Sequence, residues 1–276
     1  MDPKARYVPV PGTFYSYDGR LDPGLAELHQ RVAQLRAEGR LSRPALKQLL
    51  RFFRIKDIYN SNAIEGNALD IGETRLVVEQ GLTITGKPLR DSLEAKNLAH
   101  ALDYFEELAT HTDHPIRGID VRNIHAAILK GIDDTNAGAL RRTNVEISGS
   151  SYKPPLHESV GPLMEEFEAW LEASTAPGVN SSNPLVLAAA AHTWLVYIHP
   201  FVDGNGRTAR ILMNLVLMRS GYPIAIITKD DRERYYDALE ASQTSDLTGV
   251  VGLVQESVTE SLQEWQYAVD QQIRLA

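Results

Sequence analysis

Residues 184–210 read PLVLAAAAHTWLVYIHPFVDGNGRTAR, an almost wholly apolar segment that runs into a loop rich in glycine and arginine. The segment 184–198 is apolar on nearly every face, which predicts a central helix packed on all sides. Pro200 disfavours helical geometry in the residue before it, so this helix is expected to end at His199. The next helix is expected over residues 204–219. His199 is therefore placed at the mouth of a loop between two helices.

Helical periodicity also dominates the rest of the chain, and the predicted fold class is all-α with a small β-hairpin flap. The hairpin is predicted because Val145 and Ile147 alternate with polar residues before Gly149 and a pair of prolines. Residues 1–20 show no clear period and are read as an irregular lead-in. Besides the two central helices, helices are expected over residues 23–39, 44–66, 72–81, 91–110, 121–130, 156–173, 229–241 and 248–273.

The composition restricts the functional classes. The chain has 276 residues with 43% hydrophobic and 23% charged content, so a large buried core is expected. Its net charge of -8 argues against nonspecific binding to nucleic acid or to an anionic membrane. The absence of cysteine excludes disulfides and thiolate metal sites. The longest apolar run is too short for a membrane helix and no signal-peptide core is present, so the cytoplasm is the expected compartment.

The loop after the apolar helix combines the groups that handle phosphate. The first amides of the helix that follows Gly204 and Gly206 have no internal partners, which favours an anion there. Arg207 and Arg210 are three residues apart and can face one ligand, while Asp203 offers oxygen ligands for Mg²⁺. Each feature alone has an ordinary explanation as a helix cap, a turn or a solvated helix face. Their combination predicts a phosphate-handling site.

The residues from His199 to Arg210 also match the Fic motif His-Pro-Phe-x-[Asp/Glu]-Gly-Asn-Gly-[Lys/Arg]-x-x-Arg at every defined position. Over about residues 45–270 the chain therefore resembles the Fic (Fic/Doc) family. The resemblance implies a Fic-fold helical bundle. It divides the chain into an N-terminal helical region at 1–90, with an inhibitory helix at about 45–66, and a Fic core at 91–276. The core would contain the flap, at about 141–155, and the C-terminal helices.

By this resemblance the activity is transfer of AMP from ATP to a Ser, Thr or Tyr hydroxyl of a target protein. His199 would be the general base, and Asp203 would hold Mg²⁺. The resemblance also implies contacts to the phosphates, which would come from Gly204, Asn205, Gly206, Arg207 and Arg210. Tyr236 and Leu239, beside Tyr235, are similar to residues of the family's adenine pocket. The flap would dock an extended target segment through Val145 and Ile147, and it begins near Gly138 and Arg141.

An upstream segment, Ser61-Asn-Ala-Ile-Glu65-Gly66, places Ser61 and Glu65 on one helical face. An ordinary helix end with one exposed glutamate is the simpler interpretation. The segment nevertheless resembles the family's inhibitory motif [Ser/Thr]-x-x-x-Glu-[Gly/Asn] at every defined position. The resemblance implies that Glu65 pairs with Arg210, keeps that arginine from the γ-phosphate of ATP and leaves the protein nearly silent.

Three alternatives to AMP transfer stay open at this point. The same pocket could remove AMP from a modified protein with Glu65 positioning a water, it could use another phosphate-containing donor, or the chain could be a nucleotide-binding module without catalysis. His192 is expected to be a hydrogen-bonded core histidine rather than a metal ligand. The sequence does not identify the target protein or the signal that relieves inhibition, and it leaves self-modification and a homodimer open.

Overall fold

The computed structural model describes residues 6–147, 150–179 and 182–270. Within these ranges the chain forms ten α-helices and one two-stranded sheet, which confirms the all-α fold class. The helices are α1 (Asp22–Ala37), α2 (Arg43–Ile64), α3 (Ile71–Gln80), α4 (Leu89–Thr110), α5 (Gly118–Leu129), α6 (His157–Ser174), α7 (Pro184–Ile198), α8 (Asn205–Arg219), α9 (Arg232–Ser242) and α10 (Thr248–Asp270). The three residues expected after Asp270 in the last helix lie outside the described residues.

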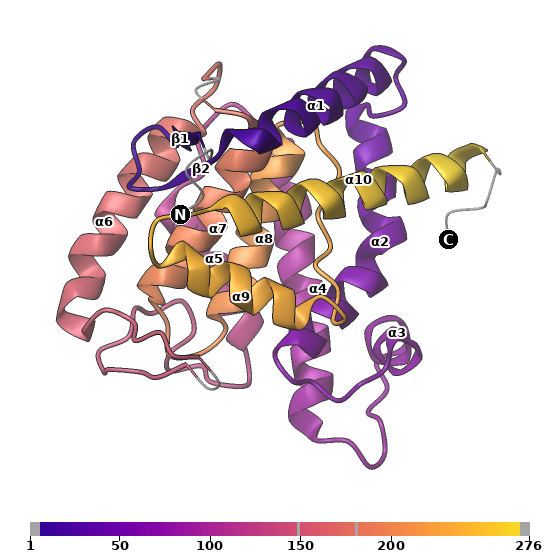
Figure 1. The fold of residues 1–276 in the computed structure, drawn as a ribbon. Coiled ribbons are helices and arrows are strands. Elements are labelled where there is room, and N and C mark those ends of the chain that lie inside the picture. The colour runs from indigo at the N-terminus through magenta and orange to yellow at the C-terminus, as the bar shows by residue number, and fades with distance from the viewer. Residues whose placement is uncertain (1–5, 148–149, 180–181, 271–276) are drawn as a thin grey trace.

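Helices α7 and α8 form the centre of the bundle and make its most extensive helix–helix contact (Figure 1). Asn183 starts α7, because its side-chain oxygen accepts a hydrogen bond from the Leu185 amide at 2.9 Å, and Pro184 fits the first turn. All of residues 185–195 are buried, as are residues 207–218 of α8. The loop between the two helices is therefore held at both ends by the core.

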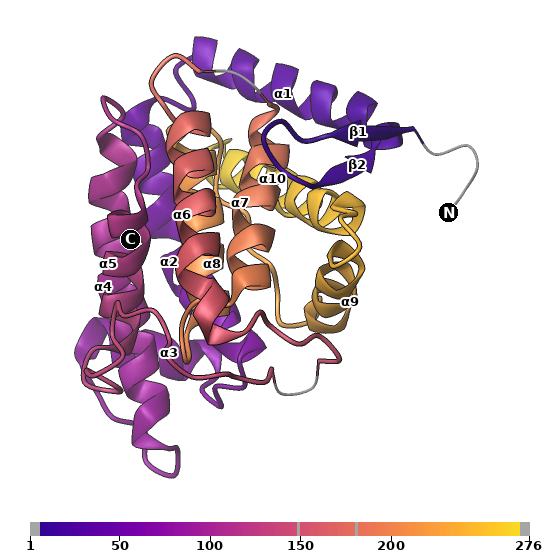
Figure 2. The same ribbon diagram turned by 90° about the vertical axis from the view of Figure 1, so that its left-hand side faces the viewer.

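The remaining helices surround this central pair (Figure 2). Helices α2, α4 and α5 pack against α8, while α6 and α10 pack against α7. Helix α9 packs on α10, and α1 lies against α10. One continuous cluster of buried apolar residues includes side chains from α1 and α2 as well as from α7, α8 and α10. Among the described residues, no helix is both long enough and apolar enough to cross a bilayer.

The sheet lies where the sequence predicted an irregular lead-in. Strands β1 (Tyr7–Pro9) and β2 (Ser16–Asp18) pair antiparallel, with Val8 opposite Tyr17. The prediction for residues 6–20 is therefore wrong, and residues 1–5 lie outside the described part of the chain. Strands of three residues are too short to give a periodic signal. This hairpin is also supported from a distant segment, since the Ser16 amide donates to the Ser245 carbonyl at 2.9 Å.

The predicted hairpin at 145–155 is not formed by the residues that the structure describes there, which exclude 148 and Gly149. Arg141 donates to the carbonyls of Thr143, at 3.0 Å, and Pro155. Tyr152 donates its hydroxyl to the Tyr197 carbonyl at 2.9 Å. The segment is thus held by side-chain bonds to its surroundings instead of by a strand ladder. We keep the name flap for residues 141–155.

Candidate active site

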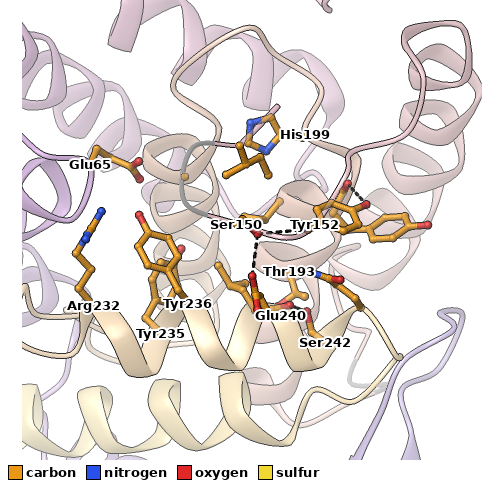
Figure 3. A pocket seen from close by; sticks show the side chains of 16 residues that line it. Glu65, Ser150, Tyr152, Thr193, His199, Arg232, Tyr235, Tyr236, Glu240 and Ser242 are labelled. Carbon is orange, nitrogen blue, oxygen red and sulfur yellow. Dashed lines mark hydrogen bonds between the residues drawn. The ribbon is translucent and has the colours of Figure 1, made fainter. Parts of the chain in front are cut away.

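His199 ends α7 and turns the chain into the site. Its backbone has φ 49° and ψ 57°, a left-handed conformation that is uncommon for residues other than glycine and concentrates at functional sites. Arg141 supports this conformation, because its Nε donates to the His199 carbonyl at 2.8 Å and its amide donates to the Pro200 carbonyl at 2.9 Å. The imidazole lines a pocket together with Glu65 (Figure 3). The expectation that the helix ends at His199 is confirmed.

The imidazole of His199 is neutral in this state. Burial lowers its pKa to about 4, the carbonyl of Val196 opposes this change, and the charge of Arg141 adds to it. A neutral imidazole can accept a proton. Negative charge bound nearby raises the pKa of a histidine, so a nucleotide in the site would make His199 a stronger base.

The loop that follows His199 is closed by Asn205. The side-chain amide of Asn205 accepts from the Phe201 amide and donates to the Phe201 carbonyl, both at 2.9 Å. Gly204 has a φ of 76°, and the helix α8 begins directly after it. The first amides of α8 are therefore presented at the loop. Asn205 thus shapes this turn from within, and the phosphate contact that the resemblance implies for it stays a prediction.

A buried histidine that the sequence did not single out holds the same loop. His125 of α5 stacks on Phe201 with ring centroids 3.6 Å apart. Its Nε2 lies 2.9 Å from the Asp203 carbonyl, and its Nδ1 accepts from the Gly138 amide at 2.9 Å. Because Nδ1 accepts a hydrogen bond, Nε2 carries the proton and donates a hydrogen bond to the Asp203 carbonyl. His125 thus joins the backbone at Gly138, which precedes the flap, to the loop that follows His199.

Asp203 and Arg207 belong to a closed ring of four charges, which we name the charge ring: Arg90 and Glu94 from α4 with Asp203 and Arg207. Arg207 lies 3.2 Å from both Asp203 Oδ1 and Glu94 Oε1. Arg90 bonds Glu94 Oε1 at 3.0 Å and also contacts Asp203 Oδ2. Arg207 is buried, while Arg90 and Asp203 are partly exposed. The sequence predicted the two residues of the motif but not the two of α4.

Arg210 is bound by the end of α2. Its Nη2 donates to Glu65 Oε1 at 2.8 Å and to the Ser61 carbonyl at 2.7 Å, and its Nε donates to Ser61 Oγ at 3.0 Å. A Cβ on Gly206 would lie 2.3 Å from Glu65 Oε1, so this carboxylate rests against the bare backbone of α8. The structure therefore brings together the residues of the two sequence motifs. Gly66 follows with a φ of 96° and ends the helix.

A second contact holds Arg210 from the core side. Its Nη1 donates to the Tyr235 hydroxyl at 3.3 Å, and that hydroxyl lies 2.9 Å from His192 Nε2. His192 is fully buried, and burial lowers its pKa to about 3. His192 is therefore neutral and hydrogen-bonded in the core, as predicted.

The pocket beside His199 has a cavity volume of about 200 Å³ and opens to solvent. Tyr236 and Leu239 of α9 line it, and the Arg232 guanidinium lies 5.0 Å from the centre of the Tyr236 ring. Ile147 of the flap lines the pocket, whereas Val145 is half-buried and does not.

Glu240 connects the flap to the helix below the pocket. Its Oε1 accepts from the Ser151 amide and from the Ser150 hydroxyl, both at 3.1 Å (Figure 3). Hydrogen bonds from the two serines lower the pKa of this carboxyl. The flap is therefore attached to α9 along one wall of the pocket.

The donor set fits a magnesium ion held largely by a nucleotide. Within residues 6–147, 150–179 and 182–270, no group of three or more histidine or acidic side chains could hold a metal. Asp203 would supply one carboxylate at the start of α8. Mg²⁺ is commonly bound by one or two carboxylates with phosphate oxygens and water as the other ligands.

Comparison with known proteins agrees with this geometry. The model of the Fic/DOC family matches residues 115–217. A structure of Fic-1 from C. elegans is 31% identical with a TM-score of 0.74, and the match covers 92% of this chain and 76% of that one. The chain belongs to the Fic/DOC family. A Fic-domain signaling protein from Bacteroides thetaiotaomicron is 26% identical, with a TM-score of 0.77 and coverage of 90% and 97%.

Among curated sequences, the Fic protein adenylyltransferase of Aedes aegypti is 35% identical over 227 residues. That match covers 82% of this chain but 44% of the relative, so the chain spans less than half the length of the mosquito protein. The Fic motif at 199–210 lies inside the part that the family model matches, and Ser61 and Glu65 precede it.

Acid is expected to destabilise this Fic protein through its buried histidines. Burial lowers the pKa of His125 and His199 to about 4 and that of His192 to about 3, against about 6.5 when unfolded. Between pH 6.5 and 4 the unfolded chain therefore binds more protons, and the free energy of unfolding falls as the pH falls, by at most about 1.4 kcal/mol per pH unit for each histidine. Asp57 partly offsets this, because burial raises its pKa to about 7. Urea unfolding at pH 7, 6 and 5 measures the trend, and equal stability at the three pH values would contradict it.

Replacing His125 with alanine is expected to lower the free energy of unfolding by about 2–5 kcal/mol, because two partly buried backbone groups lose their hydrogen-bond partner and a cavity forms against Phe201. Urea denaturation monitored by tryptophan fluorescence measures the change. His111→Ala is the control, since that histidine is exposed. Equal effects of the two substitutions would show that His125 does not hold the loop.

Proposed function

We propose that this chain is a protein adenylyltransferase that transfers AMP from ATP to a Ser, Thr or Tyr hydroxyl of a target protein, and that Glu65 inhibits it. The observation that carries the proposal is the pairing of Glu65 with Arg210 beside a neutral His199. That arrangement places a proton acceptor, an anion-binding helix start and a blocked arginine around one pocket. The names of the curated relatives support the same activity.

In the proposed mechanism the base of ATP lies in the pocket against Tyr236 and Leu239. The phosphates lie at the first amides of α8, including those of Gly206 and Arg207, where the helix dipole and the arginines favour negative charge. The role of Asn205 is to keep this turn closed. Asp203 would hold Mg²⁺, which when bound neutralises charge on the phosphate oxygens.

The target hydroxyl loses its proton to the unprotonated imidazole of His199 as its oxygen attacks the α-phosphorus of ATP. The bond from the α-phosphorus to the oxygen bridging to the β-phosphate breaks, and pyrophosphate leaves with that bond's electron pair. Arg207 and Arg210 would balance the charge on the phosphate oxygens. Only when Glu65 withdraws is Arg210 free for this task. The target backbone would dock along the flap at Val145 and Ile147, and we propose the cytoplasm as the compartment.

The position of the label in ATP tests the transferred group. The Glu65→Gly protein is incubated with cell lysate and with ATP labelled at either the α- or the γ-phosphate. Adenylyl transfer labels target proteins, or the enzyme itself, from the α-position only, and mass spectrometry identifies the modified residue. Label from the γ-position would indicate phosphate transfer, and binding of ATP without label from either position would indicate a nucleotide-binding module. Competition with other nucleotides identifies a different donor.

One observation favours removal of AMP as a second activity. Glu65 lines the same pocket as His199, and its side chain is one-third exposed, so its carboxylate could position a water for attack on a bound adenylylated side chain. AMP release from a target that has already been modified tests this activity. Glu65→Gly would abolish that release of AMP while raising AMP transfer. Equal release by the unchanged protein and the Glu65→Gly protein would contradict a role of Glu65 in removing AMP.

A further inference from the structure

The two oxygens of the Asp203 carboxylate are both engaged within the charge ring. Oδ1 accepts from the Gly204 amide at 2.5 Å and from Arg207 Nη2 at 3.2 Å. Oδ2 is contacted by Nη2 of Arg90. A cation that binds Asp203 therefore approaches an oxygen that a guanidinium group already contacts.

The two arginines differ in how readily they can move. The side chain of Arg207 is 3% exposed, and it starts one turn along α8 from Asp203. The side chain of Arg90 is 55% exposed and comes from the first turn of α4. When Arg90 leaves Asp203, Glu94 keeps its ion pair with Arg207 and its hydrogen bond from Asn67 at 3.0 Å. Arg90 is thus the displaceable member of the charge ring.

We propose that Arg90 competes with the divalent cation for Asp203 and so weakens metal binding at the site. This inference rests on the proposed function, which makes Asp203 the metal ligand. The guanidinium and the metal ion are both positive and cannot both occupy the Oδ2 side of the carboxylate. The bond from Arg90 Nε to Glu94 keeps the competitor close after each displacement. Arg90 is a positioning residue in this role, since it acts through Asp203.

The inference predicts that removing the Arg90 guanidinium tightens metal binding. Contacts between partly exposed charges are worth about 0.2–1 kcal/mol, so Arg90→Ala should lower the Mn²⁺ dissociation constant by up to about five-fold. The free Mn²⁺ signal in electron paramagnetic resonance, recorded with the same concentration of a non-hydrolysable ATP analogue for every variant, compares this constant between variants independently of transfer activity. Competition with Mg²⁺ then relates the result to the expected metal.

A double-mutant cycle distinguishes Mn²⁺ binding at Asp203 from nonspecific Mn²⁺ binding to this acidic protein. Asp203→Asn should weaken Mn²⁺ binding, and in that background Arg90→Ala should have no further effect. Arg234→Ala is the matched control, because Arg234 of α9 forms an ion pair with Glu256 of α10 and is 53% exposed. It removes the same charge from the protein and should leave the Mn²⁺ constant unchanged.

The outcomes distinguish this inference from the proposed function. If Asp203→Asn weakens Mn²⁺ binding but Arg90→Ala does not strengthen it beyond the Arg234→Ala control, the competition is overturned while the metal ligand stands. If Asp203→Asn has no effect, Asp203 does not bind the metal, and both the competition and the metal part of the proposed function are overturned. ADP binding in the presence of EDTA tests whether Arg90 instead contacts the phosphates. If Arg90→Ala weakens ADP binding and does not tighten Mn²⁺ binding, Arg90 is a phosphate contact and the competition is overturned.

Discussion

The Glu65→Gly protein is expected to transfer AMP about 10²-fold faster than the unchanged protein. The substitution removes the carboxylate that binds Arg210 at 2.8 Å and that lies against Gly206. Arg210 then becomes available to the γ-phosphate, and negative charge no longer repels the nucleotide from the start of α8. A single positioned donor to a charged transition state is commonly worth 10²–10³-fold in rate, which sets the scale of the gain. Incorporation of α-labelled AMP into target protein measures it.

The control for this substitution is Glu38→Gly. Glu38 occupies the same position at the end of α1 that Glu65 occupies at the end of α2, but its carboxylate accepts a hydrogen bond from Gln34 instead of from Arg210. Its substitution tests whether a glycine at a helix end loosens the fold enough to change the rate. The Ser61→Ala protein should show a smaller gain, since it removes one of the hydrogen bonds to Arg210 and leaves the carboxylate. A transfer rate that is equal in Glu65→Gly and Glu38→Gly would refute inhibition by Glu65.

His199→Ala is expected to reduce transfer by the Glu65→Gly protein by about 10²–10⁴-fold, the usual contribution of a positioned general base. The loss should appear in kcat, with the dissociation constant for ATP little changed, because the imidazole meets the target hydroxyl and not the base or the β- and γ-phosphates in the proposed mechanism. Isothermal titration calorimetry of ATP binding, combined with the transfer assay, separates the two effects.

The matched control is His100→Ala on the exposed face of α4, which should leave both quantities unchanged. Because His199 also fixes a left-handed turn, circular dichroism must show that the alanine protein keeps its helices. Transfer by the folded His199→Ala, Glu65→Gly protein at the rate of its Glu65→Gly parent would exclude His199 as the base.

The helices of the bundle could be predicted from sequence because each carries its own apolar pattern. The segment 184–198 is the clearest case, and Pro200 also fixed where it ends. The strands could not be predicted in the same way. Val145 and Ile147 alternate as in a strand, yet the flap is held by Arg141 and other side chains. The real hairpin at Tyr7–Asp18 is supported by a contact with Ser245, which no local pattern encodes.

The candidate site also combines residues that a local pattern predicted with residues that only the fold brings together. His199, Asp203 and Arg207 lie within nine residues, so their spacing alone indicated a phosphate site. His125 and Arg90 lie 78 and 113 residues from Asp203 in the sequence and reach it only through the packing of α4 and α5 on α8. Nothing in their local sequence distinguishes them from ordinary helix residues. Glu240, which contacts the flap 89 residues away, was missed for the same reason.

In the proposed mechanism, the contact of Glu65 with the bare backbone of Gly206 makes Glu65 a competitive ligand that is tethered to the protein. The tether is α2, whose end is buried and fixed by Arg232 Nε donating to the Ile64 carbonyl at 2.8 Å. A tethered ligand acts at an effective concentration that does not change when the protein is diluted. More ATP would therefore relieve the inhibition only weakly. In the proposed mechanism, release of Arg210 requires the last turn of α2 to move, which would break the hydrogen bond from Arg232 to the Ile64 carbonyl.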